Sequence, residues 1–377
     1  KKIFFISGIL TGLCFAPIYF LPGLLGFSFL AHHIYKSAYL KQSLIIGYFF
    51  GFGFFLSSLY WISFSIFVYI NEFWWVFPFA LLGLPLFLAT FCALFAGVMF
   101  YLRHSLYYQL LFCIVWIFTE WVLSWLFTGF PWAMVGYSFA FSQILSQSAS
   151  LFGVLGLSFI AVYMGTCLYK SDERVALVFT SIIILAVMLL YGSERLKKFP
   201  TEYTDISLKI VQPSIQQESK WSPEIFWDNL DKLINLSSDS NKADLIIWPE
   251  SALTLPHNSP LIANKLKDLL SKSNSILITG STEEEGIFDH DGYKLFVSMV
   301  AIDKNLYPVF LYNKTHLVPF GEYMPFRDYI PLKKLTYGTI DYTPGKRTNT
   351  SINSLNLSIY PLICYETIFF NEITTDN

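Results

Sequence analysis

Long apolar stretches dominate the first half of the chain. They cover residues 3–35, 44–70, 73–102, 106–127, 144–169 and 175–191. A bilayer core about 30 Å thick is crossed by roughly 20 apolar residues in a helix. The first stretch is too long for one crossing and is broken at Pro22-Gly23, so this half predicts seven helices. Because the stretches are apolar on every side, they favour membrane spans over the buried core of a soluble protein.

The pattern changes from residue 207 onward, where short apolar segments alternate with amphipathic ones. Strands are expected at 207–212, 243–248, 275–280, 294–302, 309–313 and 357–363, and helices at 224–236 and 262–273. Such alternation is typical of a layered α/β domain, in which ligand sites lie at the carboxyl ends of strands. We therefore predict a transmembrane helical domain, residues 1–193, followed by an α/β domain, residues 194–377.

Charged residues follow the same division. The chain is 54% hydrophobic and only 14% charged, whereas soluble proteins carry about 25% charged residues. Residues 1–193 contain seven Lys/Arg and four Asp/Glu, and the remainder contains 18 and 23. The formal net charge of −2 excludes a nucleic-acid-binding protein that works by neutralising phosphates.

The basic residues of the first half predict its orientation. They precede the first predicted helix or follow the second, fourth and sixth: Lys1, Lys2, Lys36, Lys41, Arg103, Lys170 and Arg174. Basic loops face the cytoplasm, so seven spans place the N-terminus inside and the α/β domain outside. The bulky residues at 17–20 are unlike a signal-peptidase cleavage site, so the first helix is expected to remain as an anchor.

Glu120 is a notable ionisable residue within a predicted span. An acid at membrane depth is costly and indicates function by default. The alternative is that Glu120 lies near the outer interface and bonds to a neighbouring helix. The segment TGFPW at 128–132 is typical of an interfacial aromatic belt.

Cys364 is the single cysteine of the second half. A lone exported thiol is either buried and inert or reactive. Cys364, Glu250 and Lys314 each follow a predicted strand, where a charge is often only the first solvated residue. Together, however, they form a nucleophilic set. The acid can take the thiol proton, the cation can hold a thiolate and an oxyanion, and the sulfur can attack a carbonyl.

In that order and spacing, Glu250, Lys314 and Cys364 resemble the Glu-Lys-Cys triad of the nitrilase superfamily. The flanking motifs resemble the apolipoprotein N-acyltransferase family more specifically. These motifs are WPES at 248–251, NK at 313–314, LVPFGEY at 317–323, ICYE at 363–366, GFGFF at 51–55 and TGFPW at 128–132. The resemblance extends from the first helices to the last residues.

The resemblance implies an inner-membrane bacterial enzyme with a periplasmic nitrilase-like αββα sandwich domain. Such an enzyme takes an acyl chain from the sn-1 position of a phospholipid, typically phosphatidylethanolamine, and holds it as a thioester. It then passes the chain to the α-amine of diacylglyceryl-cysteine in an apolipoprotein, a ping-pong reaction. By this match Cys364 is the nucleophile, Glu250 the general base and Lys314 the oxyanion stabiliser.

The resemblance also implies roles for four further residues. Glu322 and Glu366 match supporting acidic positions, and Tyr365 and Trp221 match positions linked to substrate handling. For Trp221, a packing or interfacial role is an equal alternative. No cofactor is implied, and His257, His290 and His316 show no convincing zinc-ligand spacing.

Two departures from the family pattern stand out. The family has an Arg three residues after the position of Glu120, where this chain has Leu123. The chain also stops thirteen residues past Cys364, so we expect the α/β domain to be incomplete. Three alternatives to the acyltransferase therefore stay open: a membrane-anchored C–N hydrolase, a non-catalytic lipoprotein-binding relative and, more weakly, a transporter.

Overall fold

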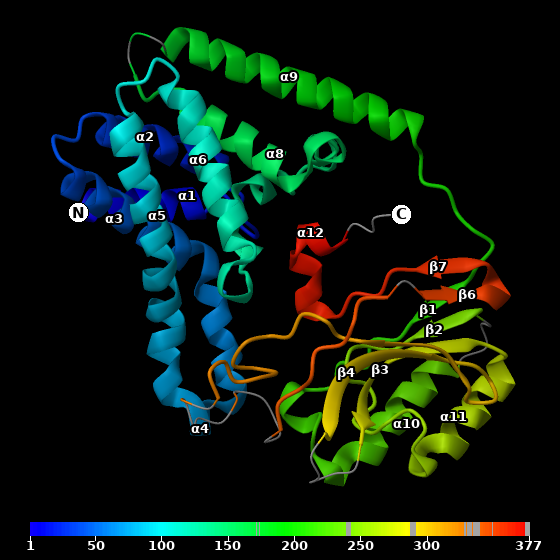
Figure 1. The fold of residues 1–377 in the computed structure, drawn as a ribbon. Helices are drawn as coiled ribbons and strands as arrows, with labels where there is room; N and C mark the ends of the chain where they lie inside the picture. The colour runs from blue at the N-terminus through cyan, green and yellow to red at the C-terminus, as the bar shows by residue number, and fades with distance from the viewer. Residues whose placement is uncertain are drawn as a thin grey trace. The chain divides into compact units, whose positions relative to one another are not determined.

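The computed structural model describes residues 1–170, 172, 174–238, 243–286, 292–327, 329, 334, 340–348 and 350–373. It divides into two compact units, Lys1–Thr201 and Glu202–Asn377, and each is described by itself (Figure 1). The division predicted after residue 193 falls within the last helix of the first unit.

Apolar helices build the first unit. Within the described residues its α-helices are α1 (Lys2–Gly12), α2 (Gly26–Tyr35), α3 (Leu40–Leu59), α4 (Ile70–Phe73), α5 (Leu84–Leu102), α6 (Tyr108–Leu123), α7 (Gln143–Ser146), α8 (Ala149–Gly165) and α9 (Arg174–Lys198). Apart from the short α4 and α7, each overlaps one of the seven helices expected from the sequence. The break at Pro22-Gly23 does separate α1 from α2, and it lies in a 3₁₀ turn, Leu21–Leu25.

Within the described part of the chain, three helical stretches are long and apolar enough to cross a bilayer. They are Leu40–Val68, Phe79–Leu102 and Arg174–Lys198. The helices Lys2–Gly12, Tyr108–Leu123 and Ala149–Gly165 are apolar but shorter. The structure therefore supports a membrane unit with three candidate spans, and the count of seven stays a prediction.

Small residues let the helices of this unit pack closely. Helix α3 packs against both α1 and α5 (Figure 1). A Cβ on Gly53 would lie 2.0 Å from the carbonyl oxygen of Phe5 in α1, and one on Gly47 would lie 2.3 Å from that of Cys92 in α5. Such contacts are typical of membrane helices, because only small residues allow the backbones to approach this closely.

Glu120 lies buried on α6 and is hydrogen-bonded within the unit. Its Oε1 atom accepts from the Trp116 indole nitrogen at 2.9 Å and from the Val135 main-chain nitrogen at 2.8 Å. The second contact joins α6 to Val135, three residues beyond the TGFPW segment.

The second unit is built on a mixed five-stranded sheet. Its strands are β1 (Leu208–Ile210), β2 (Leu245–Ile247), β3 (Ile276–Glu285), β4 (Lys294–Ile302) and β5 (Pro308–Asn313), in that spatial order. The pairs β1–β2 and β2–β3 are parallel, and β3–β4 and β4–β5 are antiparallel. The α/β character predicted from the sequence is confirmed, and the structure adds that the sheet is mixed.

Alternation along the strands gives this sheet two apolar faces. Helices α10 (Phe226–Ser237) and α11 (Pro260–Ser273) cover one face, where Leu233 and Leu266 pack on Ile246 (Figure 1). On the other face, Ile278 and Phe310 pack with the hairpin of β6 (Thr350–Ile352) and β7 (Leu357–Ile359). The last described helix is α12 (Phe370–Ile373).

The strand expected over 357–363 is shorter than predicted. Strand β7 ends at Ile359, and Cys364 begins a 3₁₀ turn, Cys364–Ile368. Pro361 explains the difference, because proline has no N–H to donate to a ladder. Cys364 therefore lies in a turn beyond the sheet instead of at a strand end.

Candidate active site

Glu250 lies in the turn that follows β2. The buried Trp248 anchors this turn, and its indole nitrogen donates to the Ser237 hydroxyl at 2.9 Å. On the neighbouring strand, a Cβ at Gly280 would lie 2.3 Å from the main-chain nitrogen of Ser251. The glycine thus allows the turn to press against β3, which leaves the Glu250 side chain 38% exposed at the carboxyl end of β2.

Lys314 directly follows β5, and its side chain is 1% exposed. Its Nζ atom donates to Oε1 of Glu322 at 2.7 Å and lies 3.8 Å from Oε1 of Glu250. The other Glu322 oxygen accepts from the Val318 main-chain nitrogen at 2.8 Å. A buried ammonium is costly unless it is paired and hydrogen-bonded, so Glu322 both accommodates Lys314 and aims it at Glu250.

Cys364 adopts a left-handed backbone conformation with φ of 49°. This region is uncommon for residues other than glycine, and such strain clusters at functional sites. Beyond the effect of burial, the negative charge of the Glu250 carboxylate acts on the thiol and raises its pKa. The tight turn thus presents an exposed cysteine whose sulfur is partly buried.

The surroundings of Cys364 favour the protonated thiol. Partial burial of the sulfur raises its pKa, the negative charge of Glu250 raises it further, and Lys314 lowers it. The thiol therefore keeps its proton at neutral pH, and a reaction through its sulfur would need a nearby base to accept that proton.

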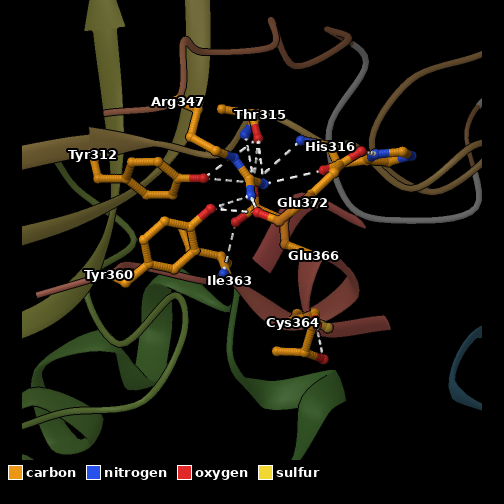
Figure 2. Close-up of polar contacts among 10 residues, drawn as sticks. Tyr312, Thr315, His316, Arg347, Tyr360, Ile363, Cys364, Glu366 and Glu372 are labelled. Atoms are coloured by element: carbon orange, nitrogen blue, oxygen red, sulfur yellow. Dashed lines mark hydrogen bonds and ion pairs between the residues drawn. The ribbon is translucent and has the colours of Figure 1, made fainter. Parts of the chain in front are cut away.

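Glu366 joins the two segments that carry Lys314 and Cys364 (Figure 2). Its fully buried carboxylate accepts from the Tyr312 hydroxyl, the Thr315 nitrogen and hydroxyl, and the His316 nitrogen through Oε1, and from the Ile363 nitrogen through Oε2. Burial by itself raises the pKa of this carboxyl, but the hydrogen bonds outweigh it and hold the pKa below its usual range. Glu366 is thus a buried anion that fixes both segments.

The sequence did not single out Arg347 and Glu372, which complete this cluster. The Arg347 guanidinium donates to the Tyr360 hydroxyl at 2.7 Å and lies 3.1 Å from Oε2 of Glu372 and 3.9 Å from Oε1 of Glu366 (Figure 2). It therefore provides positive charge to two carboxylates. No local pattern marks Arg347, because it lies between strands with no periodic neighbours.

Tyr365 and Trp221 occupy different surroundings. Tyr365 is buried beside Cys364, with its ring 5.1 Å from Phe369 and 5.6 Å from His316, and burial raises the pKa of its hydroxyl. Trp221 lies in the turn after a 3₁₀ segment, Gln217–Ser219. Its neighbour Lys220, which the sequence did not single out, contacts Glu250: the Lys220 ammonium donates to the Glu250 carbonyl oxygen at 2.8 Å.

Two histidines of the second unit make local hydrogen bonds. His257 pairs with Glu283 at 2.9 Å, and His316 pairs with Glu372 at 3.0 Å while stacking on Phe369. His290 lies outside the described residues. Among the residues that the structure does describe, no three His, Cys, Asp or Glu side chains are grouped to hold a metal ion.

Comparisons with known proteins identify relatives of both units. The family model "Apolipoprotein N-acyltransferase N-terminal domain" matches residues 7–167, and "Carbon-nitrogen hydrolase" matches residues 210–375. The apolipoprotein N-acyltransferase of Rickettsia prowazekii is 47% identical over 100% of this chain and 77% of its own length. That of Rickettsia bellii is 47% identical over 98% and 75%, and that of Brucella melitensis is 32% identical over 87% and 64%. The chain therefore belongs to the apolipoprotein N-acyltransferase family.

Proposed function

We propose that this chain transfers a fatty acyl group to the N-terminal amine of apolipoproteins, with Cys364 as the covalent carrier. One observation carries the assignment of residues. The Glu250 carboxylate lies 3.8 Å from the Lys314 ammonium, and both groups act electrostatically on the Cys364 thiol. A base, a nucleophile and a cation are thus grouped together, as acyl transfer through a covalent intermediate requires.

The first half-reaction loads the enzyme. Glu250 takes the proton from the Cys364 sulfur, and the thiolate attacks the ester carbonyl carbon of a phospholipid. Lys314 stabilises the negative charge that forms on the carbonyl oxygen. The ester C–O bond then breaks, Glu250 returns the proton to the departing alkoxide, and a lysophospholipid leaves.

The second half-reaction unloads the enzyme. The amine of a diacylglyceryl-cysteine attacks the thioester carbonyl, and Glu250 accepts a proton from the nitrogen. The C–S bond breaks, and Cys364 recovers a proton as the amide is released. An α-amine has a reference pKa of about 7.7–8.0, so a useful fraction is neutral and nucleophilic near pH 7.

The remaining assignments follow from the family and from the sequence. We place the chain in the bacterial inner membrane with seven spans, a cytoplasmic N-terminus and a periplasmic αββα catalytic domain. The proposed donor is the sn-1 chain of a phosphatidylethanolamine-like lipid. Glu322 and Glu366 support the triad, and Tyr365 and Trp221 contact substrate.

Mass spectrometry tests the covalent intermediate. The full chain in detergent is mixed with phosphatidylethanolamine of one defined acyl chain, and the intact protein is weighed. We expect one added acyl group in the wild type and none in Cys364→Ala. Adding a diacylated lipopeptide should then remove the adduct and yield a triacylated peptide in equal amount.

The match of residues 210–375 to the carbon-nitrogen hydrolase family favours one competing function. A membrane-anchored hydrolase would share the triad but pass the acyl group to water. Free fatty acid without acylated lipopeptide would support that reading. A wild-type protein that forms no adduct would instead support a non-catalytic, lipoprotein-binding relative.

A further inference from the structure

Lys220 places a second ammonium group beside the proposed general base. The residue lies in the segment between β1 and α10, and its Nζ atom donates to the main-chain carbonyl oxygen of Glu250 at 2.8 Å. Both residues line a cavity of about 140 Å³ at the carboxyl ends of β1 and β2. The cation is thus attached to the turn that carries Glu250.

The polar side chains that line this cavity beside Lys220 and Glu250 are neutral. They belong to Gln212, Ser214, Gln217, Asn229, Ser251 and Thr254. Of the cavity's lining residues, Lys220 therefore supplies the positive charge that faces Glu250. Partial burial lowers the pKa of Lys220, and the negative charges of Glu250 and of a Cys364 thiolate partly offset that effect.

The net charge of the groups around Cys364 indicates what a second cation would contribute. The thiol experiences the negative charges of Glu250 and Glu322 and the positive charge of Lys314. Lys314 is already shared between the two carboxylates, at 3.8 and 2.7 Å. These three groups carry a net charge of −1, which opposes the formation of a thiolate, and the addition of Lys220 makes the set neutral.

We propose that Lys220 is a positioning residue for the acyl-transfer reaction. It holds the Glu250 turn through the carbonyl oxygen and supplies the positive charge that favours the Cys364 thiolate. The proton still moves from sulfur to Glu250, and Lys220 keeps its own proton throughout. The inference rests on the proposed function only in taking Cys364 as the nucleophile.

Alkylation of Cys364 measures this effect without any lipid. Iodoacetamide is neutral and reacts with thiolates, so its rate against pH reports the ionisation of the thiol. The full chain is kept in detergent, and the peptide that carries Cys364 is quantified by mass spectrometry. This readout excludes the four other cysteines, which are buried in the first unit.

Removing the charge of Lys220 should shift the midpoint of that rate profile to higher pH. In Lys220→Met we expect the midpoint to rise by about half to one pH unit, and the rate at pH 7 to fall about 3- to 10-fold. Lys220→Arg keeps the charge and should stay within about 0.3 pH units of the wild type. Lys209→Met is the matched control, because the Lys209 ammonium also donates to a main-chain carbonyl, that of Ser237 at 3.2 Å.

The outcomes separate the inference from a merely structural role and from the proposed function. An unchanged midpoint in Lys220→Met, or an equal shift in Lys209→Met, overturns the electrostatic role. If Lys220→Met unfolds, Lys220→Gln gives the same comparison. A shifted midpoint in a chain that forms no acyl adduct would refute the acyltransferase assignment while leaving the role of Lys220 intact.

Discussion

Glu366 accepts two hydrogen bonds from Thr315, one from its main-chain nitrogen at 2.8 Å and one from its hydroxyl at 2.7 Å. Thr315 directly follows Lys314, and Glu366 lies two residues after Cys364. These bonds therefore join the segment that carries the proposed oxyanion stabiliser to the turn that carries the proposed nucleophile. Neither segment has a regular ladder there to hold it, so a buried carboxylate provides the connection.

Substitution of Glu366 should disturb both stability and catalysis. In Glu366→Gln the amide NH₂ must face one of the N–H or O–H donors that the carboxylate now accepts, which leaves a buried donor without a partner. We expect a loss of about 2–4 kcal/mol in the free energy of unfolding and slower formation of the acyl adduct. Thermal unfolding and intact-mass kinetics check the two effects.

A conservative variant gives the comparison for Glu366→Gln. Glu366→Asp keeps the charge but shortens the side chain, so it should retain more stability than Glu366→Gln while still slowing the reaction. Equal stability of Glu366→Gln and the wild type would contradict the assigned role of the carboxylate.

The depressed pKa of Glu366 predicts a specific dependence of stability on pH. Because the folded-state pKa lies below the unfolded value of about 4.3, its contribution is fully present above that value. It should disappear as the pH falls from about 4.3 through the lower folded-state pKa, where the unfolded chain binds the proton first.

Unfolding at a series of pH values checks this dependence. The difference in free energy of unfolding between wild type and Glu366→Gln should be largest near pH 7 and should shrink below about pH 4.3. A difference that stays constant from pH 7 to pH 3 would show that the ionised form of Glu366 contributes no stability.

Lys314 and Glu322 should behave as a coupled pair. Lys314→Met leaves the Glu322 carboxylate, which is 12% exposed, without its ammonium partner at a cost of about 3–5 kcal/mol. Glu322→Gln in the same chain removes that unpaired charge, so the double variant should lose less stability than the two single variants summed. Acyl-adduct formation should stay at least about 100-fold slower, because the proposed oxyanion stabiliser is absent.

An exposed pair provides the control for this cycle. Lys265 and Asp231 join α11 to α10 on the surface, with side chains 40% and 49% exposed. The cycle of Lys265→Met and Asp231→Asn should show a coupling of at most about 1 kcal/mol. If the losses in free energy of unfolding caused by Lys314→Met and Glu322→Gln simply add, the two side chains are not energetically coupled.

Local pattern predicted most elements of the fold. The helices of the first unit follow from unbroken apolar runs, and β2 and β5 follow from short apolar segments with Glu250 and Lys314 just beyond them. The strand predicted at 357–363 was too long, because its apolar residues surround Pro361, which has no N–H to donate to a ladder. Cys364 is instead held in a turn by bonds from residues about fifty positions earlier, and these are not visible in a local pattern.

The same reasoning explains why Lys220 and Arg347 were missed. Each is one charged residue in an irregular segment, where the expected role is a solvated surface charge. Their importance comes from what the sheet brings beside them: the Glu250 carbonyl for Lys220, and the Glu366 and Glu372 carboxylates for Arg347. Such partners are brought together by tertiary contacts. A sequence motif identifies a site residue only where its neighbours in sequence also belong to the site.

The contacts of Glu120 predict that the hydrogen-bond acceptor Oε1 contributes more to stability than the negative charge of the side chain. Glu120→Ala removes the acceptor for the Trp116 indole and the Val135 main-chain nitrogen, so we expect the free energy of unfolding to fall by about 1–3 kcal/mol. Glu120→Gln keeps one such oxygen and should lose at most about 1 kcal/mol. Glu72→Ala, on an exposed residue of α4, is the control and should leave stability unchanged. Thermal unfolding in detergent and adduct formation are measured together. If Glu120→Gln abolishes the adduct while its stability is preserved, the carboxylate acts in the reaction, and the purely structural role at this position is wrong.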